Sequence, residues 1–158
     1  MSQHKKLLFV CLGNICRSPA AEGTMKRLVE QAGRQDEFFI DSAGTGRWHV
    51  GELPDERMQR AAAARGLLLD SRGRQIKAQD LESFDLILAM DSENYRNILD
   101  LDRTGKYHDK VKMMLSYLDG DGPKDVPDPY YGGSDGFDRV LDLLEKACSR
   151  LLASFDEK

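Results

Sequence analysis

The 158-residue sequence is poor in cysteine, tryptophan and proline, and it contains no long apolar run. Its three cysteines form an odd number without the spacing of a disulfide framework, so we expect free thiols and a reducing, cytoplasmic setting. The polar start "MSQHKK" leads into the short apolar stretch 7–12, which is too brief for the core of a signal peptide or for a membrane span. We therefore expect no association with a membrane.

Neither sign of charge dominates the sequence, and possible metal ligands are scattered along it. A net charge of −4 argues against a protein that binds nucleic acid or membrane surfaces through its overall charge. The three histidines lie far apart, and the pair Cys11 and Cys16 lacks a second pair of ligands, which argues against a zinc site. The length fits one domain, residues 1–158, that buries about two-thirds of its unfolded surface.

Short apolar runs alternate with helical periodicity along the chain. The runs 5–11, 38–40, 86–90 and 111–115 are predicted as buried strands. Strands that alternate with helices form a parallel sheet with helices on both faces, and such sheets bind ligands at the carboxyl ends of their strands. The sequence therefore predicts a single α/β domain whose site lies at that edge.

Helical periodicity follows the predicted strands. The first helix is predicted to have Pro19 at its first position and Gly33 as its stop, with one apolar face formed by Ala21, Met25, Leu28, Val29 and Ala32. Further helices are predicted over about 54–66 and 92–99. A last helix has its apolar positions at Phe137, Val140, Leu141, Leu144, Ala147, Cys148, Leu151 and Leu152. Cys148 is therefore predicted to be a core thiol without a chemical role.

The stretch 10–19, "VCLGNICRSP", lies where the first strand ends and the first helix begins. Gly13 and Asn14 tolerate the unusual dihedrals that turn successive backbone N–H groups inward around a phosphate. Arg17 adds a planar fork that can hold two phosphoryl oxygens at once. The inward N–H groups, the helix dipole and Arg17 favour a thiolate at Cys11, and a thiolate is a nucleophile. Ser18 can offer its hydroxyl to this sulfur and is also a candidate N-cap.

A structural alternative to this interpretation also exists. Cys11 could be a small buried hydrophobe that ends a strand, with Arg17 a solvated residue at the helix start. The complete string at a strand-to-helix turn favours the functional interpretation. Cys16 is open to two interpretations: it can resolve a peroxide-oxidised Cys11 as a disulfide, or it fills space under the helix.

The loop "DVPDPYYGG" supplies a candidate proton donor. Asp128 lies between two prolines that restrict its backbone, and an acid above the pocket can protonate a phenolate leaving group. The rings of Tyr130 and Tyr131 could form walls for an aromatic substrate. The alternative is that Asp128 is an ordinary turn residue, since the same region also contains Asp119, Asp121 and Asp125.

With both elements present, the sequence resembles the low-molecular-weight protein tyrosine phosphatases over nearly its whole length. The resemblance rests on "VCLGNICRSPAAEG" near the N-terminus and "DPYYGG" before the last helix, with "DSAGTGRWHVG", "ARGLLLDSRGRQI" and "FDLILAMDSENYRNI" between them. It implies a four-stranded parallel sheet with a phosphate-binding loop between the first strand and the first helix. It also implies hydrolysis of phosphotyrosine in proteins, without a metal or other cofactor.

The resemblance assigns roles to individual residues. Cys11 becomes a phosphocysteine, Arg17 binds the phosphoryl group, and Asp128 protonates the leaving phenol and then activates water. The substrate-binding residues are Leu12, Gly13, Asn14, Ile15, Cys16, Ser18, Trp48, Tyr130 and Tyr131. The phosphate loop is supported by Asn14, Ser18 and Ser42, with Asn14 hydrogen-bonded to Ser42. We expect tyrosine-phosphorylated proteins as partners and a monomer or weak homodimer.

One departure from the family pattern concerns this support. Many members have a histidine three residues before the arginine of "ARQ", and it supports the phosphate loop through the asparagine. This chain has Ser71 before Arg74, so we expect the support to be weaker or rerouted.

Three other functions each fit part of the sequence. Thioredoxin-coupled arsenate reductases share the fold and the cysteine loop, but they need further cysteines, which this chain lacks between Cys16 and Cys148. A non-catalytic phosphotyrosine-binding module would not need Cys11, Arg17 and Asp128 together. A flavodoxin-like carrier would bind phosphate with serine and threonine rather than a thiol.

Overall fold

The computed structural model describes residues 5–118, 124–129 and 135–156. Four parallel strands form one sheet in the order β2-β1-β3-β4. The strands are β1 (Lys5–Cys11), β2 (Phe38–Gly44), β3 (Leu86–Ala89) and β4 (Val111–Met113). The predicted parallel sheet is therefore confirmed, and β1 is one of its two central strands.

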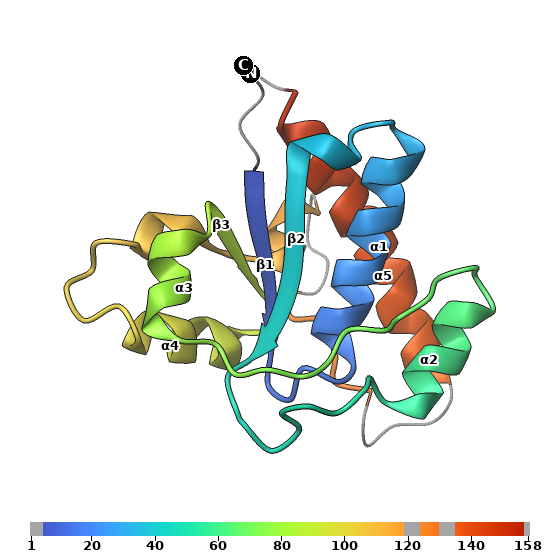
Figure 1. Ribbon diagram of the computed structural model, residues 1–158, viewed down its shortest axis with the longest axis horizontal. Coiled ribbons are helices and arrows are strands. Elements are labelled where there is room, and N and C mark those ends of the chain that lie inside the picture. Colours follow the sequence, from blue (N-terminus) through green and yellow to red (C-terminus); the bar gives the residue numbers. More distant parts are fainter. Residues whose placement is uncertain (1–4, 119–123, 130–134, 157–158) are drawn as a thin grey trace.

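Helices cover both faces of the sheet. Helix α1 (Arg17–Gln31) packs beside α5 (Asp135–Ser154) on one face, and α2 (Glu56–Ala63) contacts α5 (Figure 1). Helices α3 (Ala78–Ser83) and α4 (Ser92–Asp100) lie on the other face (Figure 1). In the described part of the chain, short 3-10 helices cover Gln35–Glu37, His108–Lys110 and Met114–Tyr117.

The alternation of side chains along β1 builds a core on each face. Leu7, Phe9 and Cys11 join the cluster under α1 and α5. Leu8 and Val10 join the cluster under α3 and α4. Because successive side chains of a strand point to opposite faces, a run that is apolar at every position is buried on both sides. Cys148 lies in the first cluster with no exposed surface, in agreement with the prediction of a core thiol.

The structure corrects the predicted ends of several elements. Helix α1 begins at Arg17 after Cys16, so Ser18 is not its N-cap and Pro19 occupies the third helical position. Proline is tolerated there because the N–H groups of a first helical turn have no intrahelical acceptor. The helix ends at Gln31, Gly33 adopts the left-handed φ of 69° expected of a stop, and Ala32 is exposed rather than part of the apolar face.

Two further differences lie in the second half of the chain. The fourth strand ends at Met113, because the next four residues, Met114–Tyr117, form a 3-10 helix that buries Met114 and Leu115. The sequence also did not predict the short helix α3. Among the described residues, no helix is long and apolar enough to cross a membrane.

Candidate active site

The loop of residues 12–16 joins the carboxyl end of β1 to the start of α1. The start of this loop is tied to the segment that follows β2, because Thr45 N–H donates to the carbonyl of Cys11 at 2.9 Å and Gly46 N–H donates to that of Leu12 at 2.9 Å. Asn14 has a φ of 58°, a left-handed conformation that asparagine tolerates better than most residues. The loop therefore curls back under the end of the sheet, as the sequence predicts for an anion cradle.

The sulfur of Cys11 is surrounded by hydrogen-bond donors. The backbone N–H groups of Asn14 and Ser18 approach Sγ at 3.3 and 3.4 Å, and the Ser18 hydroxyl lies 3.0 Å from it. Cys16 precedes α1 as its N-cap without a side-chain hydrogen bond, and no acid lies in the described first turn. The N–H groups at this helix end therefore remain directed at the loop, and together these donors stabilise negative charge on the sulfur.

The side chain of Asn14 organises the loop from behind the sulfur. Its Nδ2 donates to Ser18 Oγ at 2.8 Å and to Ser42 Oγ at 3.0 Å. Its Oδ1 accepts the backbone N–H of Arg74 at 3.0 Å. Both ends of this buried amide are thus engaged, so its orientation is determined.

The backbone of Arg74, three residues after Ser71, contacts the loop through Asn14. The carbonyl of Arg74 accepts Gly44 N–H at 2.8 Å, beside its contact with Asn14. Its guanidinium is held by Asp41 at 3.1 Å and by Asp80 at 3.0 Å. The loop is therefore supported from a backbone position that two carboxylates fix.

Arg17 enters the site from the first turn of α1 and is only 3% exposed. Its Nη1 donates to Asp91 Oδ2 at 2.6 Å and to the carbonyl of Val126 at 3.0 Å. These contacts fix the guanidinium from one edge, and the other edge carries Nε and Nη2, which can bind two phosphoryl oxygens. Burial opposes the charge, but the charge of Cys11 and the hydrogen bond with Asp91 outweigh it and raise the pKa of Arg17.

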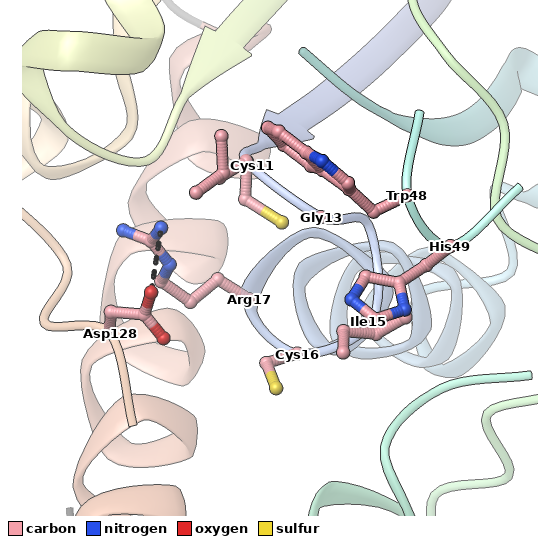
Figure 2. Close-up of a pocket in the computed structure, with 9 residues that line it drawn as sticks. Cys11, Gly13, Ile15, Cys16, Arg17, Trp48, His49 and Asp128 are labelled. Carbon is pink, nitrogen blue, oxygen red and sulfur yellow. Dashed lines mark ion pairs between the residues drawn. The ribbon is translucent and has the colours of Figure 1, made fainter. Parts of the chain in front are cut away.

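A pocket of about 320 Å³ opens above the sulfur. Its lining residues are Cys11, Leu12, Gly13, Ile15, Cys16, Arg17, Trp48, His49 and Asp128. Figure 2 shows the sulfur of Cys11 directed into this pocket, with the ring of Trp48 on one side and Asp128 on the other. Asp128 Oδ2 lies 3.7 Å from Arg17 Nη2, so a carboxyl group and a cation share the mouth of the pocket.

The outer wall of the pocket is apolar and partly open to solvent. The ring of Trp48 is 70% exposed, and Leu12 is also exposed. A Cβ on Gly46 would lie within 2 Å of the Trp48 ring, so only glycine at position 46 leaves room for the indole in this position. An exposed aromatic side chain beside a buried nucleophile can bind a flat substrate ring.

The structure brings together most of the residues predicted for the site. Asn14, Ser18 and Ser42 are not among the residues that line the pocket, and their side chains hydrogen-bond to one another behind the sulfur. Tyr130 and Tyr131 lie outside the described residues.

Two residues of the site were missed by the sequence interpretation. Asp91 orients Arg17 across 74 positions of sequence, and no local signal links the two. His49 lines the pocket, and its Nδ1 is 2.9 Å from Glu52 Oε2. Its position next to Trp48 in "DSAGTGRWHVG" could have indicated it.

Cys16 lines the same pocket as a thiol. Burial is the main cause that raises the pKa of the Cys16 thiol, and the charges of Asp55 and Cys11 act in the same direction. In Figure 2 its side chain points away from the sulfur of Cys11. All three cysteines are free in the structure.

A buried cysteine under inward N–H groups, an arginine from the following helix and an acid at the mouth of the pocket are the parts of a phosphatase that uses a cysteine nucleophile. Residues 6–158 match the family described as low molecular weight phosphotyrosine protein phosphatase. The chain belongs to this family, and the resemblance seen in the sequence is confirmed.

Relatives and solved structures agree with this membership. A protein of Synechocystis sp., provisionally named a low molecular weight protein-tyrosine-phosphatase, is 54% identical over 97% of this chain and 98% of its own length. The crystal structure of a protein tyrosine phosphatase from Entamoeba histolytica aligns with a TM-score of 0.92 at 44% identity and covers 97% of both chains. A Drosophila structure described as an arginine phosphatase aligns with a TM-score of 0.91 at 35% identity, over 97% of this chain and 99% of the other.

Proposed function

We propose that this protein hydrolyses phosphotyrosine in proteins through a phosphocysteine formed on Cys11. The observation that carries this proposal is the single pocket in which the sulfur of Cys11, the guanidinium of Arg17 and the carboxyl group of Asp128 meet. The family and its named relatives support the same activity.

In the first step the thiolate of Cys11 attacks phosphorus, a sulfur–phosphorus bond forms, and the bond from phosphorus to the phenolic oxygen breaks. The leaving oxygen takes a proton from Asp128, which stands at the mouth of the pocket near Arg17. The loop N–H groups and Arg17 bind the oxygens of the phosphoryl group, whose charge develops in the transition state.

In the second step water attacks the phosphocysteine and Asp128 accepts its proton. The sulfur–phosphorus bond breaks, inorganic phosphate is released, and the thiolate of Cys11 returns. Ser18 lies 3.0 Å from this sulfur, so its hydroxyl stabilises the thiolate as it departs.

The shape of the pocket favours an aryl phosphate over other phosphorylated side chains. Cys11 is 3% exposed at the bottom of the pocket, so the substrate must be long enough to reach it from the rim. Leu12 and Trp48 at the rim match a phenyl ring. Phosphoserine is too short to place its phosphate on the sulfur, and phosphoarginine would place a polar guanidinium against these apolar walls.

We expect kcat/KM for a phosphotyrosine peptide to exceed that for the matched phosphoserine and phosphoarginine peptides by about a hundredfold or more. Release of inorganic phosphate from three peptides that differ only in the modified residue measures this selectivity. Trp48→Ala should weaken aryl phosphate binding without changing inhibition by inorganic phosphate, whereas Val50→Ala on the same loop should change neither. Equal turnover of all three peptides contradicts the assignment.

We also propose that Cys16 protects Cys11 during oxidation. Peroxide would convert the Cys11 thiolate to a sulfenic acid, and attack by the Cys16 sulfur would form a disulfide and release water. The Cys16 side chain points away from the Cys11 sulfur in Figure 2, so the loop must rearrange before the two sulfurs can meet. The raised pKa of the Cys16 thiol also keeps the fraction of reactive thiolate small, so the disulfide forms slowly.

Mass spectrometry after peroxide treatment tests this switch. We expect a Cys11–Cys16 disulfide in the wild-type protein, with activity restored by added thiol. Cys16→Ser should lose activity irreversibly, because Cys11 then proceeds to the sulfinic state. Identical recovery of the wild-type protein and Cys16→Ser would show that Cys16 only fills space.

The free thiols bear on the cellular compartment in which the protein acts. Three unpaired cysteines, all buried, are typical of a protein in a reducing compartment. We therefore infer that the protein acts in the cytoplasm, on tyrosine-phosphorylated proteins of that compartment.

A further inference from the structure

Glu22 is a buried carboxylate that the reaction steps above do not use. It lies on α1, one turn beyond Ser18, and is only 5% exposed. A carboxylate at this depth is costly unless both of its oxygens have partners. Oε2 forms an ion pair with Lys26 Nζ at 2.6 Å, and Oε1 accepts the hydroxyl of Ser42 at 2.5 Å. The second contact connects Glu22 to the residues behind the nucleophile.

The bond between Glu22 and Ser42 determines the direction of a chain of hydrogen bonds. A carboxylate can only accept, so the Ser42 hydroxyl must donate to it. The oxygen of Ser42 is then an acceptor for Asn14 Nδ2, which lies 3.0 Å away. If the Ser42 proton pointed toward Asn14 instead, the Ser42 O–H and the Asn14 Nδ2–H would face each other as two donors without an acceptor between them.

The same direction continues to the nucleophile. Asn14 Nδ2 uses its other proton on Ser18 Oγ at 2.8 Å, which leaves the Ser18 proton for an acceptor. Two acceptors lie in reach: the sulfur of Cys11 at 3.0 Å and the carbonyl of Ala43 at 3.4 Å. The shorter contact is with the sulfur, and a hydroxyl that accepts a hydrogen bond becomes a better donor.

We propose that Glu22 is a positioning residue that holds Ser42 and Asn14 in the one hydrogen-bond direction that delivers the Ser18 proton to the sulfur of Cys11. This inference rests on the proposed function of Cys11 as the nucleophile. Lys26, which is exposed to solvent, balances the charge of the carboxylate, so the chain of bonds runs from an ion pair at the surface to the buried thiolate.

The proposal predicts an effect opposite in sign to that of a simple nearby charge. If Glu22 acted only as a negative charge, its neutralisation would favour the Cys11 thiolate and extend Cys11 reactivity to lower pH. If Glu22 directs the hydrogen bonds, its neutralisation weakens the contact between Ser18 and the sulfur and moves the reactivity to higher pH. If Glu22 only stabilised the fold, its neutralisation would lower the melting temperature and leave the pH dependence of Cys11 reactivity unchanged.

The test is the rate at which iodoacetamide alkylates Cys11 between pH 5 and 9, followed by mass spectrometry of the Cys11 peptide. We expect Glu22→Gln to slow alkylation at the acid end by about three- to tenfold, the effect of weakening one hydrogen bond to a charged group, and to leave the alkaline rate unchanged. Glu30→Gln, an exposed glutamate on the same helix, is the matched control and should follow the wild-type profile. An unchanged or acid-shifted profile in Glu22→Gln overturns the proposal.

Ser42→Ala tests the same connection while keeping the ion pair of Glu22 and Lys26. It should shift the alkylation profile in the same direction, and Glu22→Gln added to Ser42→Ala should shift it no further, since the two residues act through one bond. Additive shifts, or an unshifted profile in Ser42→Ala, would contradict the proposal. Alkylation needs no phosphatase turnover, so a wild-type protein that fails on phosphotyrosine would refute the proposed function and still allow this test.

Discussion

Cys11→Ser is expected to reduce kcat on aryl phosphates by about a thousandfold or more, and Arg17→Lys by about a hundredfold to a thousandfold. The serine hydroxyl is a far weaker nucleophile than a thiolate held by three donors. Lysine keeps the charge of Arg17 but presents no planar fork to two phosphoryl oxygens, and it cannot reproduce the contacts of Nη1 with Asp91 and Val126. Steady-state kinetics on an aryl phosphate measures both losses.

Two control variants separate lost chemistry from lost structure. Cys148→Ser replaces a buried cysteine on α5, and Arg103→Lys replaces an exposed arginine, so both should retain wild-type kcat in the folded protein. Cys11→Ser should still bind a phosphotyrosine peptide, since the cradle of N–H groups is intact. Retention of half the activity by Cys11→Ser or by Arg17→Lys would disprove the role assigned to that residue.

Asp128→Asn is expected to affect substrates according to their leaving group. A phosphotyrosine peptide releases a basic phenolate that needs a proton, so its turnover should fall by about a hundredfold to ten-thousandfold. An aryl phosphate with an acidic phenol hardly needs that proton and should lose much less. The alkaline limb of the pH profile should also flatten, because the group that donates the proton is gone.

A comparison across aryl phosphates whose phenols differ in acidity measures this dependence. Asp109→Asn, an exposed aspartate in the 3-10 helix His108–Lys110, is the matched control and should leave every rate unchanged. Equal losses for all leaving groups, with an unchanged pH profile, would mean that Asp128 is not the acid.

Two aspartates near the mouth of the pocket differ in contacts that residue type alone does not predict. Asp125 and Asp128 are three residues apart and equally suitable by residue type. In the structure Asp125 Oδ1 accepts the backbone N–H and the hydroxyl of Ser92, which ties it to the start of α4. Asp128 lies 3.7 Å from Arg17 and lines the pocket. The flanking prolines and the family resemblance favour Asp128, but only the tertiary contacts show that Asp125 is bonded to the start of α4 while Asp128 lines the pocket.

The sequence by itself determined the features that depend on neighbouring residues. A run that is apolar at every position predicts a strand buried on both faces, and residues 7–11 of β1 form such a run. Glycine and asparagine at the turn permit the tight curl, and a helix start without an acid in its first turn accepts an anion. The cradle, its nucleophile and its arginine could therefore be predicted from a stretch of ten residues.

Tertiary structure decided which distant side chains meet this stretch. The parallel register pairs Cys11 with Gly44 of β2 and Val10 with Ala89 of β3, so the carboxyl ends of three strands lie at one edge. That register brings Ser42 behind Asn14 and Asp91 onto Arg17. Such contacts join residues far apart in the chain, and no local periodicity encodes them, because they depend on how strands align after the core has packed.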